Sequence, residues 1–183
     1  MNVLIPLAEG VEDMEAAILI DVFRRAGWRV TTVGMTEGLI RGARGIRMAP
    51  DAFWPEIHPE GFDLMVLPGG KGGVENLRRH SDLRDALQRA QAAGKWICAL
   101  CAGPLVLVDA GLLTGRRATC YPGLELGVTG PIWLRDRVVI DGNLVTSQGP
   151  GTCFEFALAI IEKLEGAAKA KALAAELLLK TDS

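Results

Sequence analysis

Aromatic residues are scarce in this chain, and positive charge is not concentrated anywhere along it. Aromatic side chains make up only 5% of the 183 residues, whereas hydrophobic residues make up 49%, so the core must consist mainly of aliphatic side chains. The 20 Lys and Arg residues are balanced by 22 Asp and Glu residues. This balance gives no basis for binding nucleic acid or an anionic membrane, and we expect neither partner.

Long apolar runs and regular cysteine spacing are also missing. The apolar start at residues 1–8 is broken by Pro6 and is far shorter than the roughly 20 residues of a membrane span. Four cysteines, at positions 98, 101, 120 and 153, are too few and too irregular for a secreted disulfide framework. Neither they nor the two histidines have metal-ligand spacing, so we expect reduced thiols, no metal and a cytoplasmic location.

Apolar segments of strand and helix type alternate along the chain. An apolar run at 3–7 is followed by helical spacing from 11 to 26, and a β-branched run at 28–33 comes next. Further strands are predicted at 63–67 and 96–100, with helices between and after them. This alternation predicts a flavodoxin-like α/β sandwich with a mostly parallel sheet and helices on both faces. Because no linker or repeat interrupts the pattern, we expect residues 1–183 to form one domain.

The remaining segments are assigned from their turn residues. Residues 38–50 predict a short hairpin or loop, and the strands expected at 137–140 and 144–147 flank a hairpin turn. A glycine-rich turn at 149–151 begins a helix that runs to about residue 164. An Ala/Leu/Lys-rich helix is expected at 166–179.

Cys101 lies where a predicted strand passes into a predicted helix. Small residues two positions away on either side, Ala99 and Gly103, are typical of a tight nucleophile elbow. Backbone N–H groups at such a turn favour the thiolate and stabilise an oxyanion. The alternative is that Cys101 is a small buried hydrophobic residue. A disulfide with Cys98 is disfavoured, because three extended residues span roughly 10 Å and a disulfide tolerates about 7 Å between Cα atoms.

Glu15 is the second candidate. Helical spacing places it beside the apolar stripe through Val11 and Ile18, whereas Glu12 and Asp13 are expected to face elsewhere. Burial would raise the pKa of Glu15 and allow its carboxyl group to donate a hydrogen bond to a neighbouring thiolate or oxyanion. The alternative is a first-turn acid that interacts with the helix dipole.

Five segments together resemble the ThiJ/PfpI superfamily, in particular the branch of the Parkinsonism-associated protein deglycase and its bacterial relatives. They are LAEGVEDME at 7–15, RRAG at 24–27, LPGG at 67–70, ICALCAGP at 97–104, and TSQGPGT followed by FEFA within 146–157. The resemblance covers nearly the whole chain. It implies that Cys101 is a nucleophile that can oxidise to sulfinate and that Glu15 pairs with it.

The resemblance also implies further site residues. Backbone donors map onto Gly70 and Ala102, and Gly69 and Tyr121 are also expected to bind substrate or an oxyanion. Arg44 is implied to reach the site of a partner subunit in a homodimer. Two departures stand out. Ala102 follows the nucleophile where the protease-like branch has histidine, and Tyr121 precedes a proline where the deglycase branch often has histidine. Tyrosine is a poor base near neutral pH, so proton transfer would depend more on Glu15.

The function expected from this resemblance is cofactor-free chemistry on reactive carbonyls, as a glutathione-independent glyoxalase or a deglycase. Cys101 would add to an aldehyde to form a hemithioacetal, and Glu15 would shuttle the proton. The alternative is a non-enzymatic oxidation sensor or redox-regulated chaperone, in which Cys101 is oxidised to sulfinate.

Overall fold

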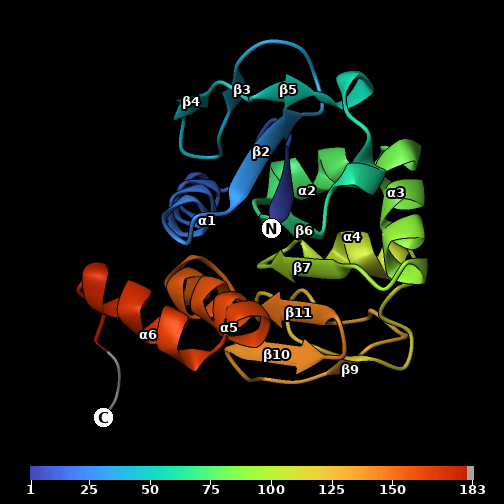
Figure 1. Ribbon diagram of the computed structural model, residues 1–183. Coiled ribbons are helices and arrows are strands. Elements are labelled where there is room, and N and C mark those ends of the chain that lie inside the picture. The colour runs from blue at the N-terminus through green and yellow to red at the C-terminus, as the bar shows by residue number, and fades with distance from the viewer. Residues whose placement is uncertain (181–183) are drawn as a thin grey trace.

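The computed structural model describes residues 1–180, and a seven-stranded sheet forms its centre (Figure 1). The strand order is β10-β11-β7-β6-β1-β2-β5, and every neighbouring pair is parallel except β10 with β11. The strands are β1 (Asn2–Leu7), β2 (Arg29–Gly34), β5 (Ala52–Phe53), β6 (Leu64–Leu67), β7 (Trp96–Leu100), β10 (Val138–Asp141) and β11 (Leu144–Ser147).

Helices cover both faces of this sheet (Figure 1). One face packs against α1 (Asp13–Arg25), α5 (Cys153–Glu165) and α6 (Ala167–Glu176). The other packs against α2 (Lys71–Arg78), α3 (Ser81–Ala92) and α4 (Pro104–Asp109). Two small sheets complete the fold, β3 (Ile40–Arg41) with β4 (Arg47–Met48) and β8 (Arg117–Ala118) with β9 (Ile132–Trp133), along with short 3-10 turns at Trp54–Glu56, Pro59–Gly61 and Pro150–Thr152.

Each central strand supplies side chains to two separate hydrophobic cores. In β7, Cys98 and Leu100 belong to the core beneath α1 and α5, while Ile97 and Ala99 belong to the core beneath α3 and α4. This alternation follows from the two-residue period of a strand. Because both faces are buried, the sequences of β6 (LMVL) and β7 (WICAL) are continuously apolar, as expected of a parallel sheet.

The fold class predicted from the sequence is confirmed, and β7 and β11 have the predicted bounds. One difference concerns the start of α2, for which the apolar spacing indicates a helix only from about residue 74. In the structure α2 begins at Lys71 and includes Gly72 and Gly73, which have no side chains to show helical spacing. A Cβ on Gly73 would lie only 2.7 Å from the Cα of Val11, so glycine permits this helix to approach the loop after β1. A second difference is that α5 begins only after a 3-10 turn. In addition, the short strands β5, β8 and β9 were not predicted.

The carboxyl ends of three neighbouring strands, β6, β7 and β11, meet at one edge of the sheet. The glycine-bearing turns after these strands are the ones that the sequence singles out, at Gly69, Gly103 and Gly149. Ligand sites in open α/β sheets form at such edges. No helix within residues 1–180 is both long and apolar enough to cross a membrane.

Candidate active site

Cys101 follows β7 directly and has an unusual backbone conformation. Its φ angle is 60°, in the left-handed region that residues with a side chain rarely adopt. Neighbouring segments hold this conformation on both sides: the N–H of Cys101 donates to the carbonyl of Ser147 at 3.0 Å, and the N–H of Tyr121 donates to the carbonyl of Cys101 at 2.9 Å. Backbone strain of this kind persists only where surrounding contacts enforce it, and it concentrates at functional sites.

Two glycines allow other groups to approach the elbow closely. A Cβ on Gly69 would lie 2.5 Å from the Cβ of Cys101, 2.9 Å from its Sγ and 2.8 Å from Oε2 of Glu15. A Cβ on Gly103 would lie 2.8 Å from the carbonyl oxygen of Leu67. Gly69 thus lies against both the sulfur and the Glu15 carboxyl group, and a larger residue at position 69 would displace them.

Glu15 is completely buried near the start of α1. Its Oε2 accepts a hydrogen bond of 2.6 Å from the N–H of Gly69, while its Oε1 is buried without a hydrogen-bond partner in the described chain. Burial raises the pKa of Glu15 to about 7, although the bond from Gly69 and the interaction with Cys101 oppose this rise. The predicted placement of Glu15 in the apolar stripe therefore agrees with the structure, and its carboxyl group can gain or lose a proton near neutral pH.

The Cys101 thiol is partly exposed and has a raised pKa. Burial and the charge of ionised Glu15 raise this pKa to about 12, while the N–H groups of Gly70 and Ala102 lower it. The prediction that the turn favours the thiolate was therefore wrong for the state in which Glu15 is ionised. Helix α4 is only six residues long, and the two N–H groups do not outweigh burial and a neighbouring negative charge.

A cavity of about 380 Å³ opens onto the sulfur. Its lining residues are Glu12, Gly70, Lys71, Val74, Glu75, Arg78, Cys101, Ala102, Leu105, Tyr121 and Leu124. The structure thus brings together the predicted residues Cys101, Gly70, Ala102 and Tyr121. Gly69 was predicted to bind substrate or an oxyanion. Its N–H instead donates a hydrogen bond to Glu15, so this group is not free to bind a substrate oxygen.

The prediction that Glu12 and Asp13 face away from the buried side of this helix was wrong for Asp13, which is buried. Glu12 lines the cavity, and its side chain adds a negative charge at the mouth. Asp13 is only 2% exposed and accepts hydrogen bonds from the N–H groups of Arg44, at 2.7 Å, and Ile46, at 2.9 Å. Asp13 therefore holds the turn between β3 and β4. The sequence signal for this role, a second acidic residue two positions before Glu15, was missed. Arg44 itself is exposed on that turn and does not line the cavity.

The other three cysteines are buried in the described chain. Cys98 and Cys153 have no exposed surface, Cys120 is 5% exposed, and burial raises the pKa of all three. Residues 1–180 contain no group of three or more His, Cys, Asp or Glu side chains arranged to hold a metal ion.

Brief exposure of the native protein to iodoacetamide is expected to label Cys101 faster than Cys98, Cys120 or Cys153. Only Cys101 combines partial exposure with a cavity that admits a small electrophile beside the Glu15 carboxyl group. Peptide mass mapping at short reaction times measures the four rates. Equal labelling at Cys120, which borders another cavity, would contradict the special reactivity of the elbow.

Comparison with known proteins agrees with this fold and shows the family of the chain. The sequence profile of the DJ-1/PfpI family matches residues 1–163. The chain is 39% identical over 181 residues to protein dj-1beta of Drosophila melanogaster, and the match covers 97% of each chain. It is 36% identical over 179 residues to a Caenorhabditis elegans protein named glutathione-independent glyoxalase DJR-1.2, covering 97% of this chain and 95% of that one. The solved structure of oxidized DJ-1 from Toxoplasma gondii superposes with a TM-score of 0.94 at 36% identity and covers 98% of this chain and 99% of the other.

Proposed function

The chain belongs to the DJ-1/PfpI family, and from this premise we propose that it converts small reactive carbonyls without a cofactor, using Cys101 as nucleophile and Glu15 as proton shuttle. The observation that carries the proposal is the buried Glu15 carboxyl group, with a pKa of about 7, beside a partly exposed thiol in a cavity. A group whose pKa lies near the operating pH is best suited to general acid–base catalysis. The C. elegans relative named as a glyoxalase supports the choice of substrate class.

The first step would join the sulfur to the aldehyde carbon of a compound such as methylglyoxal. Ionised Glu15 takes the thiol proton as the S–C bond forms. A free thiolate is therefore not needed, which matters because burial and the charge of Glu15 raise the pKa of the thiol. Protonated Glu15 then gives this proton to the carbonyl oxygen, so that a hemithioacetal results and Glu15 is ionised again. The N–H groups of Gly70 and Ala102, which face the sulfur, are the candidates to stabilise the oxygen while it is negative.

The second step would move a hydrogen within the adduct. Ionised Glu15 removes the proton from the carbon bonded to sulfur, giving an enediolate, and returns this proton to the neighbouring carbon. The hydroxyl proton on the carbon bonded to sulfur passes to the oxygen of that neighbouring carbon. The carbon bonded to sulfur is thereby oxidised to a thioester while its neighbour is reduced to an alcohol, so no external oxidant is needed. Water then cleaves the thioester to lactate and the free thiol.

Tyr121 is a candidate for binding the substrate oxygen. It lines the Cys101 cavity and is 50% exposed, and its hydroxyl group can donate a hydrogen bond there. No histidine lines this cavity in the described part of the chain. Glu15 therefore carries the proton transfers in this proposal.

A second candidate function is an oxidation sensor, and the unpaired Oε1 of Glu15 is the observation that favours it. Peroxide would oxidise the Cys101 thiol to sulfenic acid and then to sulfinate, and protonated Glu15 would donate a hydrogen bond to a sulfinate oxygen. The solved T. gondii relative is described as oxidized, which agrees with a redox-active family member.

Turnover of methylglyoxal without glutathione separates the two candidates. Reduced protein should convert methylglyoxal to lactate, which proton NMR identifies directly. Absence of lactate, together with selective conversion of Cys101 to sulfinate by mild peroxide, would favour the sensor.

We further propose that the protein is a homodimer in which Arg44 approaches the site of the partner subunit. The turn that carries Arg44 is exposed, and its backbone is fixed by Asp13, two residues from Glu15. Sedimentation at micromolar concentration is expected to show a dimer, and Arg44→Ala is expected to raise the KM for methylglyoxal more than it lowers kcat. A monomer with full activity would contradict the shared site.

A further inference from the structure

Two buried hydroxyl groups lie in the segment that joins β11 to α5. Ser147 has no exposed surface, and Thr152 is only 4% exposed. Both belong to the sequence TSQGPGT at 146–152, to which the reaction proposed above assigns no role. Neither residue lines the Cys101 cavity. Any effect that they have on the reaction must therefore pass through a neighbouring residue.

The distances around the two hydroxyl groups define the direction of their hydrogen bonds. Ser147 Oγ lies 2.6 Å from the carbonyl oxygen of Arg137 and 2.6 Å from Oγ1 of Thr152. Each hydroxyl group has a single proton, so only one arrangement places a proton in both of these contacts. In it, Thr152 donates to Ser147 and Ser147 donates to Arg137. The Gly149 carbonyl, also 2.9 Å from Thr152 Oγ1, already accepts the N–H of Thr152 at 2.9 Å, and the Gly149 N–H donates to Thr152 Oγ1 at 3.0 Å.

This chain of hydroxyl groups holds the residue that supports the elbow. The carbonyl of Ser147 accepts the hydrogen bond from the N–H of Cys101 at 3.0 Å, and Cys101 has a φ of 60°. Such a backbone persists only where the surrounding contacts enforce it. The pairing of β11 with β7 fixes the backbone of Ser147, and the bonds to Arg137 and Thr152 fix its side chain. A shift of Ser147 would therefore be passed on to the sulfur of Cys101.

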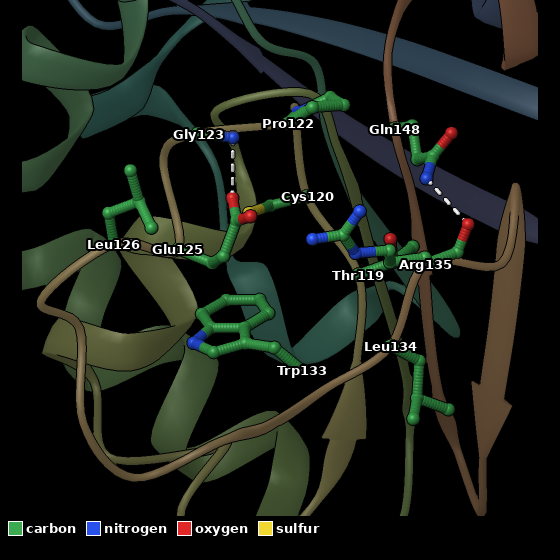
Figure 2. Close-up of a pocket in the computed structure, with 10 residues that line it drawn as sticks. All are labelled: Thr119, Cys120, Pro122, Gly123, Glu125, Leu126, Trp133, Leu134, Arg135 and Gln148. Carbon is green, nitrogen blue, oxygen red and sulfur yellow. Dashed lines mark hydrogen bonds between the residues drawn. The ribbon is translucent and has the colours of Figure 1, made fainter.

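The same segment is also tied to the preceding loop and to the start of α1. Gln148 borders a separate cavity of about 470 Å³, and Figure 2 shows its Nε2 donating to the carbonyl of Arg135, at 2.9 Å. The thiol of Cys153, a weak donor, lies 3.8 Å from the backbone carbonyl of Glu15. Residues 147–153 thus contact the backbone of both site residues, Cys101 and Glu15.

We propose that Thr152 and Ser147 are positioning residues for the nucleophile, acting through the hydrogen bond from Cys101 to the Ser147 carbonyl. This role rests on the proposed function, because the sulfur must lie beside the Glu15 carboxyl group for the thiol proton to be transferred. Loss of the Thr152 hydroxyl group leaves the buried N–H of Gly149 without its acceptor and Ser147 Oγ without its donor. An unpaired buried group is costly, so the segment is expected to rearrange and to displace the elbow.

Thr152→Val tests this role, because valine keeps the shape of the side chain and removes the hydroxyl group. We expect kcat for methylglyoxal to fall by about 100-fold, the usual effect of a 1 Å misplacement, while KM stays nearly unchanged because Thr152 does not touch the substrate. Thr152→Ser keeps the hydroxyl group and should restore most of kcat. Ser147→Ala breaks the same chain and should show the same pattern as Thr152→Val. The double variant should lose no more than the more affected single variant, since both substitutions interrupt one chain.

Alkylation of Cys101 by iodoacetamide gives a measurement that does not need turnover. In the wild type, transfer of the thiol proton to Glu15 assists this reaction, and Thr152→Val should slow it by about tenfold or more. Thr32→Val is the matched control. Thr32 is also 4% exposed, and its Oγ1 donates to Oδ2 of Asp51 at 2.8 Å and accepts from the N–H of Asp51 at 2.9 Å, away from the Cys101 cavity. It should leave kcat and the alkylation rate unchanged.

The outcomes separate the positioning role from the proposed function. Wild-type alkylation in Thr152→Val and Ser147→Ala, equal slowing in Thr32→Val, or a raised KM with unchanged kcat would overturn the positioning role. If circular dichroism shows that Thr152→Val does not fold, Ser147→Ala becomes the deciding variant. A wild-type protein that does not convert methylglyoxal would refute the proposed function, and the alkylation rates would still decide whether Thr152 and Ser147 position Cys101.

Discussion

Replacing Cys101 by serine is expected to lower the turnover of methylglyoxal by about 10⁴-fold or more, because it removes the nucleophile on which every later step depends. The serine hydroxyl group has nearly the same size and meets the same left-handed backbone at position 101, where φ is 60°. The cavity and Glu15 should therefore remain in place, so the loss reports on chemistry. Lactate formation followed by NMR measures the residual rate.

Cys98→Ala is the control for this experiment. Cys98 is fully buried in β7 and does not line the Cys101 cavity, so its loss removes a thiol without touching the proposed chemistry. Circular dichroism would verify that both variants are folded. Substantial turnover by Cys101→Ser, or equal losses in both variants, would rule out Cys101 as the nucleophile.

Much of the fold could be predicted because its signals are local. The continuous apolar runs of β1 and β7 reflect burial of both faces of these strands, and the helical spacing in α1 reflects burial of one face of that helix. The start of α2 could not be predicted in this way. Gly72 and Gly73 are poor helix formers, and they belong to the helix because Gly73 packs against the backbone of Val11, a contact between distant parts of the chain.

The proximity of Cys101 and Glu15 was predictable, but the electrostatics of the candidate site were not. Small neighbours pointed to the elbow at Cys101, and helical spacing pointed to Glu15, with the family resemblance joining the two. The raised pKa of Cys101 depends on the charge of Glu15 and on burial by the surrounding turns, which only the folded arrangement supplies.

Glu15→Gln and Glu15→Ala are both expected to lower methylglyoxal turnover by about 10² to 10⁴-fold, the usual contribution of a general acid–base group. Glutamine can still accept the hydrogen bond from Gly69 and can donate one toward the sulfur, but it cannot accept and return a proton. Alanine removes the hydrogen bonds as well and leaves a gap beside the sulfur. Glu162→Gln, on the exposed side of α5, is the matched control for removing one carboxylate.

Glu15→Gln is also expected to change the stability of the fold, by an amount that depends on pH. The pKa of Glu15 is raised from 4.5 to about 7 in the folded state, so the folded protein holds this proton more tightly than the unfolded chain. Its contribution to stability is complete below pH 4.5 and is lost as pH rises to 7, a change of about 3 kcal/mol. Because glutamine does not titrate, Glu15→Gln should gain stability relative to the wild type between pH 4.5 and pH 8. Denaturant unfolding at the two pH values measures the gain.

Oxidation by peroxide then distinguishes the two roles of Glu15. If the carboxyl group chiefly donates a hydrogen bond to oxidised sulfur, Glu15→Gln should preserve much of the sulfinate yield at Cys101 and Glu15→Ala should not, because only glutamine keeps a donor there. If proton transfer is its main role, both variants lose turnover whatever their sulfinate yield. Wild-type turnover and wild-type oxidation in both variants would make Glu15 a buried structural carboxyl group and would refute the proposed pairing with Cys101.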